Sequence, residues 1–421
     1  MRILLTTVLC LFSGWLSAQG EYAERREALS ALLDTTTALA MKGGEEGPDQ
    51  VTRFRQDRNF LYLTGVSVPG ARMILAPRGI RIGSGIKTCF LFADLRQDPV
   101  PAVPLTSSDT LLDASRFSDV LGQALSGIHT LCYAPEASFL HDWINGKAYF
   151  TDREMRKTFE KAHPGIRLKT AVTLISRLRQ VKSPGELDVL RKAIQLTGDG
   201  LRRAIEDCRP GMYEYDIQAL IEFEAIRQGS TGMGFASIIG SGKNSLIPHY
   251  FDNNCELHAG DLIVIDVGAE WQGYSADVTR TIPVSGAFTK EQAVVYRTVL
   301  DIQKALIALI RPGVTILDIE REAFELTRAA GYGRNFLHGV THSIGLDVHD
   351  PMNGDTLCPG MVITVEPGIY IPAGDTAFPE GRRGFGIRIE DDVLVTETGS
   401  KVLSSEIPKE MAEIEKLMRK D

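Results

Sequence analysis

Two stretches of the chain repeat one pattern: Gly260-Asp261-Leu262-Ile263-Val264-Ile265-Asp266-Val267-Gly268 and, about 100 residues later, Gly360-Met361-Val362-Ile363-Thr364-Val365-Glu366-Pro367-Gly368. Each is an apolar run rich in β-branched residues, which predicts a buried strand. A carboxylate occupies the same place near the end of each run, Asp266 in the first and Glu366 in the second. A duplicated unit that delivers one buried carboxylate per copy to a shared centre indicates a site for cations.

A shorter motif precedes each stretch and extends the repeat. Arg209-Pro210-Gly211 is followed by Asp216-Ile217, and Arg311-Pro312-Gly313 is followed at the same distance by Asp318-Ile319. The second half of the chain is therefore a duplication, and its two copies are expected to pack with pseudo-two-fold symmetry.

Apolar residues at helical spacing predict a pair of helices in each copy. The first helix starts at Ser183-Pro184-Gly185-Glu186, which has the form of a capping box with proline in the first turn. The other three are expected at residues 213–228, 292–310 and 316–330. Each copy is thus expected to contain two helices followed by a hairpin. We therefore expect an α+β domain over residues 175–421 with helices outside and a sheet inside.

The residues before this domain predict a different architecture. Residues 21–170 combine strand-like runs at 71–75, 89–92 and 130–133 with helical stretches. Strands that alternate with helices predict an N-terminal α/β domain.

The start of the chain has the features of a secretory signal peptide, which we expect to cover residues 1–18. Met1-Arg2 supplies a positive charge, a short apolar run follows, and small residues stand at Ser17-Ala18. The alternative, a membrane anchor, requires a longer apolar segment than residues 3–16 provide. The mature protein is therefore expected to be exported, to the periplasm or to the exterior, without a stable membrane span.

Composition narrows the class of protein further. Hydrophobic residues make up 43% of the 421 residues and charged residues 24%, which is typical of a globular chain. The formal net charge of −8 argues against nucleic-acid binding, which favours basic patches.

A second carboxylate follows the first in each copy, Asp277 after Asp266 and Glu390 after Glu366. Gly273-Tyr274 suggests a turn, so Asp266 and Asp277 are expected on adjacent antiparallel strands that face one pocket. Four carboxylates in a buried sheet cannot all stay ionised without compensation, which divalent cations supply. Carboxylate ligands favour Mn²⁺, with Zn²⁺, Co²⁺ and Fe²⁺ as competitors, and two ions with a hydroxide between them are plausible.

Histidines supply the remaining candidates for this site. Three of the eight in the chain, His338, His342 and His349, fall close together between the two carboxylate hairpins. A lone histidine is more often a structural residue, but a glycine-rich cluster predicts one metal ligand and groups that orient substrate or move protons. His249 precedes the first hairpin and is expected to reach the same pocket.

These motifs closely resemble those of the pita-bread metallopeptidases, and among them the aminopeptidase P and prolidase group. The resemblance covers most of the chain from about residue 175 and extends to residues 54–65 of the N-terminal domain. It implies a curved pita-bread sheet and a dinuclear aminopeptidase that hydrolyses the bond between the first residue and a proline at the second position. A homo-oligomer, a dimer or a tetramer, is implied in the same way.

The resemblance also implies a role for each site residue. Asp266 would bind one metal ion, His342 and Glu366 the other, and Asp277 and Glu390 would bridge the pair. Glu366 would also carry the proton from the attacking water to the leaving nitrogen. The remaining roles fall to His349, which would steady the intermediate, to His249 and His338, which would line the proline pocket, and to Arg388, which would anchor the site by charge pairing.

Two alternatives stay open. The nearer is prolidase, which cleaves only Xaa-Pro dipeptides. The other, from a different functional class, is an inactive pita-bread domain that binds peptides, although such domains typically lose metal ligands. Ser343, which follows the ligand histidine where relatives often carry an aromatic residue, and the loop after Asp350 depart from the family pattern, so the shape of the substrate pocket is open.

Overall fold

The computed structural model describes residues 20–46, 54–96, 105–134 and 152–419, which form two compact units. The first unit ends at Arg179, and the second begins at Gln180. The signal peptide predicted for residues 1–18 lies outside the described residues. Among the described helices, none is both long enough and apolar enough to cross a membrane.

The first unit is built on a six-stranded mixed sheet with the order β4-β3-β2-β1-β5-β6. Strands β1, β2 and β3 are antiparallel, whereas β5 pairs parallel with β1 and β6, and β4 pairs parallel with β3. The α/β prediction is confirmed, and the three expected strands correspond to β2, which begins one residue later than expected, to β3 and to β5. The strands are β1 (Thr37–Lys42), β2 (Arg72–Ile82), β3 (Gly85–Ala93), β4 (Asp109–Asp113), β5 (Thr130–Ala134) and β6 (Arg167–Thr170). Its helices include α2 (Arg58–Thr64), α3 (Phe117–Leu125), α5 (Asp152–Ala162) and α6 (Val172–Arg179).

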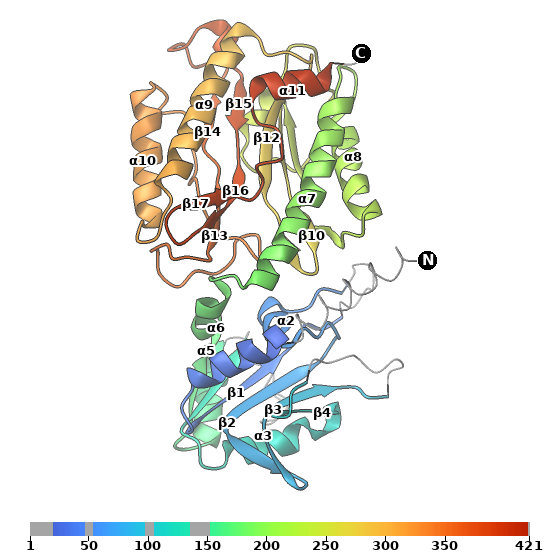
Figure 1. The fold of residues 1–421 in the computed structure, drawn as a ribbon, viewed down its shortest axis with the longest axis vertical. Helices are drawn as coiled ribbons and strands as arrows, with labels where there is room; N and C mark the ends of the chain where they lie inside the picture. Colours follow the sequence, from blue (N-terminus) through green and yellow to red (C-terminus); the bar gives the residue numbers. More distant parts are fainter. Residues whose placement is uncertain (1–19, 47–53, 97–104, 135–151, 420–421) are drawn as a thin grey trace. The chain divides into compact units, whose positions relative to one another are not determined.

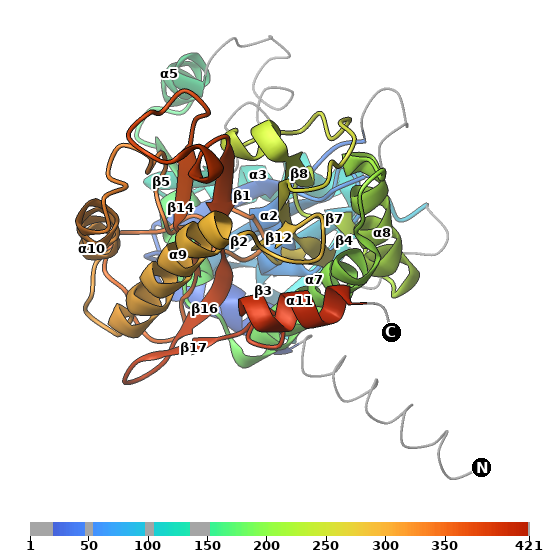
Figure 2. The ribbon, with the colours of Figure 1, turned by 90° about the horizontal axis from the view of Figure 1, so that it is seen from above.

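The second unit places two helix pairs around a group of small sheets (Figures 1 and 2). Helices α7 and α8 lie on one side of the strands and α9 and α10 on the other, as the duplication predicts. The α+β pita-bread architecture is thus confirmed. The helices are α7 (Pro184–Asp207), α8 (Glu214–Arg227), α9 (Lys290–Leu309), α10 (Ile316–Ala329) and α11 (Met411–Met418).

The strands of the second unit form nested hairpins rather than the simple ones expected. In the first copy, β9 pairs antiparallel with β12, and the residues between them in the sequence form a short hairpin of β10 and β11. In the second copy, β13 pairs antiparallel with β16, and the residues between them form the hairpin of β14 and β15. The extra hairpins follow directly after the carboxylate strands and carry the chain away from the site and back. The strands are β7 (Gly232–Met233), β8 (Ile238–Ser241), β9 (Leu262–Val267), β10 (Ala269–Trp271), β11 (Tyr274–Ser275), β12 (Val278–Pro283), β13 (Val362–Val365), β14 (Gly368–Ile371), β15 (Phe385–Arg388), β16 (Asp391–Val395) and β17 (Ser400–Val402).

The repeated aspartates of the short motif act as helix caps. The carboxylate of Asp216 accepts a hydrogen bond from the backbone N–H of Tyr213 at 2.8 Å, and that of Asp318 accepts one from Thr315 at 3.0 Å. Each satisfies a backbone donor at the start of its helix, α8 or α10, that the helix leaves unpaired. The duplication therefore fixes where the second helix of each copy begins.

The repeated glycines after the carboxylates allow close packing. A Cβ atom on Gly268 would lie 1.7 Å from the carbonyl oxygen of Ala276, and one on Gly368 would lie 2.9 Å from Nε2 of His338. Only glycine permits these approaches, so each copy needs it where the chain leaves the ligand strand.

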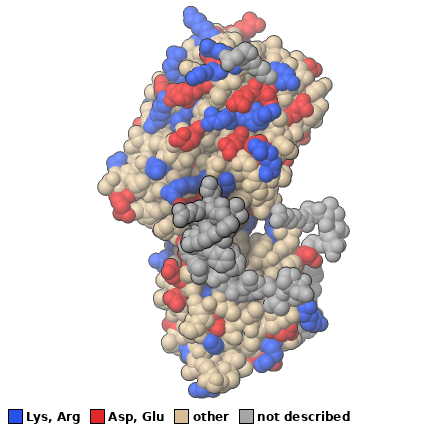
Figure 3. Space-filling model, turned by 45° about the vertical axis from the view of Figure 1, so that its right-hand side comes forward, with Lys and Arg blue, Asp and Glu red and all other residues tan. Residues whose placement is uncertain are grey.

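The exposed surface contributes less to stability than the core. Basic and acidic side chains are interspersed on the face of the second unit seen in Figure 3. Exposed pairs such as Arg191–Asp188 and Arg328–Glu325 are screened by water and contribute little. The buried aliphatic residues of β9, β12 and the helices that cover them supply most of the stabilisation.

We expect Ser183→Ala to destabilise the second unit by about 1 kcal/mol. The hydroxyl of Ser183 accepts a hydrogen bond from the backbone of Glu186, whose side chain accepts one in return from the backbone of Ser183, so the predicted capping box is present. Urea denaturation of the purified protein measures the change, and Ser183→Thr, which keeps the hydroxyl, serves as the control. A midpoint for Ser183→Ala equal to that of the wild type would show that the box is not a stabilising feature.

Candidate metal centre

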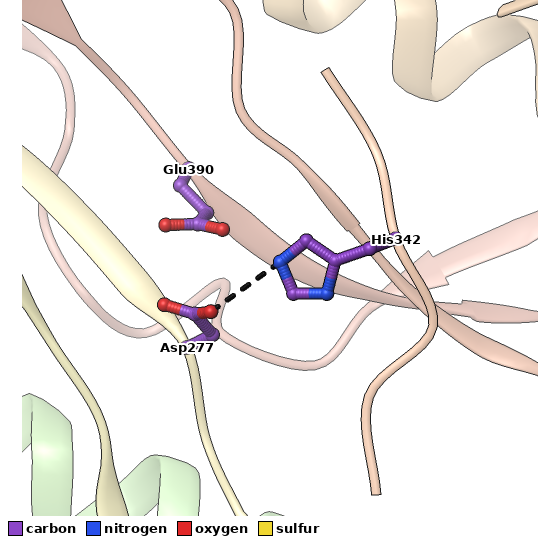
Figure 4. A group of neighbouring side chains, drawn as sticks. All are labelled: Asp277, His342 and Glu390. Carbon is purple, nitrogen blue, oxygen red and sulfur yellow. Dashed lines mark ion pairs between the residues drawn. The ribbon is translucent and has the colours of Figure 1, made fainter. Parts of the chain in front are cut away.

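The carboxylates predicted from the repeat meet at the ends of the paired strands. Asp266 lies on β9, Asp277 immediately before β12, Glu366 between β13 and β14, and Glu390 between β15 and β16. Figure 4 shows Asp277, His342 and Glu390 pointing toward one another, and their ligand atoms lie within 4.8 Å of each other. The two copies thus contribute side chains to one centre.

His342 is held in place by strand β13. Its backbone carbonyl accepts from the N–H of Thr364 at 2.8 Å, so the histidine segment runs beside that strand. The Nε2 atom of His342 lies 3.5 Å from a carboxylate oxygen of Asp277 and 3.5 Å from one of Glu366. Its Nδ1 lies 3.1 Å from the carbonyl oxygen of Ser343, which can only accept. Nδ1 therefore carries the proton, and Nε2 presents its lone pair to the centre.

Each carboxylate of the centre makes ionisation of its neighbours less favourable. Burial and then the charge of Glu390 raise the pKa of Asp277 well above its usual range, and burial followed by Glu366 does the same for the pKa of Glu390. Burial, with Asp266 and Glu320 adding to it, raises the pKa of Glu366 to about 8. The protein alone therefore does not supply enough positive charge to keep all of these groups ionised at neutral pH.

The remaining features of the centre fit divalent cations. Oδ1 of Asp266 is buried and has no hydrogen-bond partner among the described residues. Burial, and next the nearby His349, lower the pKa of His342 to about 4, so its imidazole is neutral, as metal binding requires. Carboxylate oxygens and one neutral imidazole form a donor set that suits hard or borderline divalent metals.

Arg388 ties the centre to an aromatic residue and to a second histidine. Its guanidinium group donates to Asp266 at 2.7 Å, to the hydroxyl of Tyr370 at 2.7 Å and to Oγ1 of Thr279 at 3.2 Å. The hydroxyl of Tyr370 lies 2.7 Å from Nε2 of His338. Nδ1 of His338 is 2.7 Å from the carbonyl oxygen of Gly339, so Nδ1 donates and Nε2 accepts from Tyr370.

The other predicted histidines lie at the edge of the centre. His338 is close to Glu366, with Nδ1 3.8 Å from a carboxylate oxygen. The exposed ring of His349 lies 4.2 Å from that of His342, measured between centroids. His249 is also exposed, and Arg388 donates at 3.3 Å to the carbonyl of the preceding residue, Pro248. The structure therefore gathers all nine predicted residues around one site.

Several residues that hold the ligands in place were not predicted from the sequence. Thr279 donates to Glu390 at 2.7 Å, and Asp392 accepts from the backbone N–H of Asp277 at 3.2 Å. Arg280 and Asp391 form a fully buried ion pair at 2.9 Å behind these ligands. One signal was available: Thr279 stands two residues after Asp277, and residues two apart lie on the same face of a strand.

Comparisons with known proteins agree with this geometry. Residues 188–397 match metallopeptidase family M24, and residues 22–99 match the N-terminal domain of aminopeptidase P. The chain is 34% identical to the Xaa-Pro aminopeptidase of Escherichia coli, over 94% of this chain and 97% of the relative. It is 36% identical to the Xaa-Pro dipeptidase of Pyrococcus furiosus, but over only 55% of this chain and 65% of that protein.

Solved structures show the same likeness over nearly the whole chain. The structure of Pseudomonas aeruginosa aminopeptidase PepP matches with a TM-score of 0.82 at 31% identity, covering 95% of this chain and 98% of that one. Aminopeptidase P from Escherichia coli with the inhibitor Pro-Leu matches with a TM-score of 0.80 at 32% identity, with the same coverage.

We expect the metal-free protein to lose stability as the pH rises from 6.5 to 8. In this window the folded chain holds a proton on Glu366 that the unfolded chain, with an ordinary pKa of 4.5, releases. Unfolding therefore releases protons, and stability should fall by on the order of 1 kcal/mol per pH unit for each such carboxyl group. The lowered pKa values of His338 and His342 act in the opposite direction, but their effect is complete near their ordinary value of 6.5.

Thermal melting of chelator-treated protein across this pH range tests the expectation. Glu366→Gln should show a shallower decline because the variant lacks one of the titrating groups. A melting temperature of the metal-free wild type that is constant or rises between pH 6.5 and 8 would contradict the assignment of protons to the centre.

Proposed function

The chain belongs to metallopeptidase family M24, and we propose that it is an Xaa-Pro aminopeptidase, which removes the first residue of peptides that carry proline at the second position. The observation that carries the proposal is the convergence of the complete ligand set on one buried centre. Its members are Asp266, Asp277, His342, Glu366 and Glu390. The near-complete overlap with the Xaa-Pro aminopeptidases supports the choice of substrate.

The five ligand residues would hold two divalent cations. Mn²⁺ is our first choice because four of the ligands are hard carboxylates, with Zn²⁺, Co²⁺ or Fe²⁺ as competitors. When bound, such ions polarise the scissile carbonyl and lower the pKa of a water nucleophile. A water nucleophile suits an Xaa-Pro bond, whose nitrogen lacks the N–H of an ordinary peptide.

Glu366 is the residue that moves the proton. Its carboxylate is partly open, with 17% of the side chain exposed, whereas Glu390 is buried. A carboxylate that is open to the substrate can accept a proton from water and return it to the departing proline nitrogen. The nitrogen of the leaving proline can then depart as a neutral amine.

The histidines orient the substrate around Glu366. His338 is held neutral, with its pKa lowered to about 4 by burial and by Arg388, and it presents an uncharged ring beside Glu366 to the proline side. His249 would line the same side. His349, exposed beside His342, would donate a hydrogen bond to the carbonyl oxygen of the bond that breaks.

Prolidase activity and an inactive peptide-binding role are the alternatives. The match to Xaa-Pro dipeptidase covers about half of the chain, which favours the aminopeptidase. All five ligand positions carry side chains able to bind metal, which favours an enzyme over a binding module.

Two further properties belong to the proposal. The apolar start of the chain supports export, to the periplasm or to the exterior, after cleavage of residues 1–18. A homo-oligomer, a dimer or a tetramer, is expected by family resemblance, and light scattering on the mature protein measures it.

Two peptides distinguish the activities. The purified mature protein loaded with Mn²⁺ should release alanine from Ala-Pro-Ala-Ala, and an excess of chelator should stop the release. Cleavage of Ala-Pro alone would identify a prolidase. Cleavage of neither peptide by protein that binds metal would overturn the proposal in favour of a binding role.

Replacement of Glu366 by Gln should abolish turnover while the protein stays folded. The amide cannot accept the proton, and loss of a general acid–base group reduces the rate by roughly 10²–10⁴-fold. Glu322→Gln, the same change at an exposed position of α10, is the control and should leave turnover unchanged. Circular dichroism checks the fold of both variants, and a folded Glu366→Gln variant with full activity would rule out this mechanism.

A further inference from the structure

The segment between β17 and α11, residues 403–410, packs directly behind the metal centre. The backbone carbonyl groups of Ile407 and Pro408 accept hydrogen bonds from Arg280 at 2.9 and 2.8 Å. Ser404 within the segment is 1% exposed. This tail segment therefore contacts the residues that adjoin the ligands, although it contributes no ligand itself.

Arg280 connects the tail segment to the strands that carry the ligands by hydrogen bonds to both. Its side chain is fully buried and donates to the backbone carbonyl groups of Thr279 and Glu390 as well as to the tail. The same guanidinium group forms an ion pair with Asp391. A buried ion pair adds little net stability when its desolvation is counted, so a role in fixing geometry is the more direct reason for it.

Lys409 of the tail completes this arrangement. Its ammonium group pairs with the second carboxylate oxygen of Asp391, which also accepts from Gln303 at 3.0 Å. Asp391 follows Glu390 in the chain. Its side chain is therefore held from three directions, by β12, by α9 and by the tail.

Ser404 is linked, through Asp391 and Asp392, to a ligand from each copy of the repeat. Its hydroxyl donates to Asp391 at 2.7 Å and accepts from the backbone N–H of Asp392 at 3.2 Å. The carboxylate of Asp392 in turn accepts from the backbone N–H of Asp277. One hydroxyl group is thus linked to the residue after Glu390 and, through Asp392, to Asp277.

We propose that the tail segment is a positioning element, in which Ser404 and Lys409 set the spacing of Asp277 and Glu390 and thereby the affinity of the centre for its cations. The inference rests on the proposed function, because it presupposes that these carboxylates bind metal. Residues behind the ligands that fix their orientation typically change metal affinity by roughly 10–100-fold when removed.

The chain offers a matched serine pair for the test. Ser404→Ala removes the two hydrogen bonds behind the ligands, whereas Ser400→Ala removes a 3.0 Å hydrogen bond from β17 to the carbonyl of Ile307, away from the centre. Titration calorimetry of the chelator-treated mature protein with Mn²⁺ alone gives the dissociation constants. We expect Ser404→Ala to weaken binding on the order of tenfold, and Ser400→Ala to change it by no more than about twofold.

A matched lysine pair gives an independent test. Lys409→Met removes the contact with Asp391, and Lys304→Met removes an exposed ion pair between α9 and Glu410 of the same segment. Loss of a positive charge by itself would strengthen the attraction of the centre for cations. Weaker binding in Lys409→Met, but not in Lys304→Met, therefore reports a change in ligand position rather than in charge.

The outcomes separate this inference from the proposed function. A wild-type protein that binds no Mn²⁺ would overturn the proposed function. A wild type that binds, together with Ser404→Ala that binds as tightly as Ser400→Ala, would overturn the positioning role alone. Melting temperatures of the metal-free variants identify a purely structural effect, which lowers stability without changing the affinity of the folded protein. If Ser404→Ala does not fold, the lysine pair decides by the same criterion.

Discussion

The structure depends on the cost of placing four carboxylates side by side in a buried sheet. Each would repel the others if all were ionised, and burial removes the water that would screen them. The fold supplies a buried positive charge to these carboxylates, because Arg388 pairs with Asp266. This charge compensates for part of the negative charge, and divalent ions would compensate for the rest. The buried carboxylates therefore require cations in addition to those of the protein.

Duplication explains how a single chain delivers ligands from two directions. Each copy ends a buried strand with a carboxylate and leaves that strand through a glycine, Gly268 or Gly368, which permits close packing. The copies then diverge. Only the second has a histidine segment beside its strand, so His342 breaks the symmetry and makes the two sides of the centre chemically different.

Much of this arrangement could be predicted from the sequence because its signals are local. The apolar runs that end in Asp266 and Glu366, the capping box at Ser183 and the four helices each lie within a short window, and all are present in the structure. The supporting contacts could not be predicted in this way. Arg280 meets Asp391, and Ser404 meets Asp392, only once distant segments have folded together, and no local pattern specifies such pairs. The nested hairpins were missed for a related reason, since strands of two to four residues carry too little periodicity to identify.

The hydrogen bonds around Tyr370 show why the outer contacts matter as much as the ligands. Arg388 can only donate, so the hydroxyl of Tyr370 accepts from it and must direct its own proton to Nε2 of His338. That bond fixes the tautomer of His338, and the carbonyl of Gly339 fixes the other ring nitrogen. Burial, and next the charge of Arg388, lower the pKa of His338 to about 4, so the arginine that holds Asp266 also helps to keep this ring neutral. One buried guanidinium group thus contacts Asp266 directly and reaches His338 through Tyr370, which links two parts of the candidate metal centre.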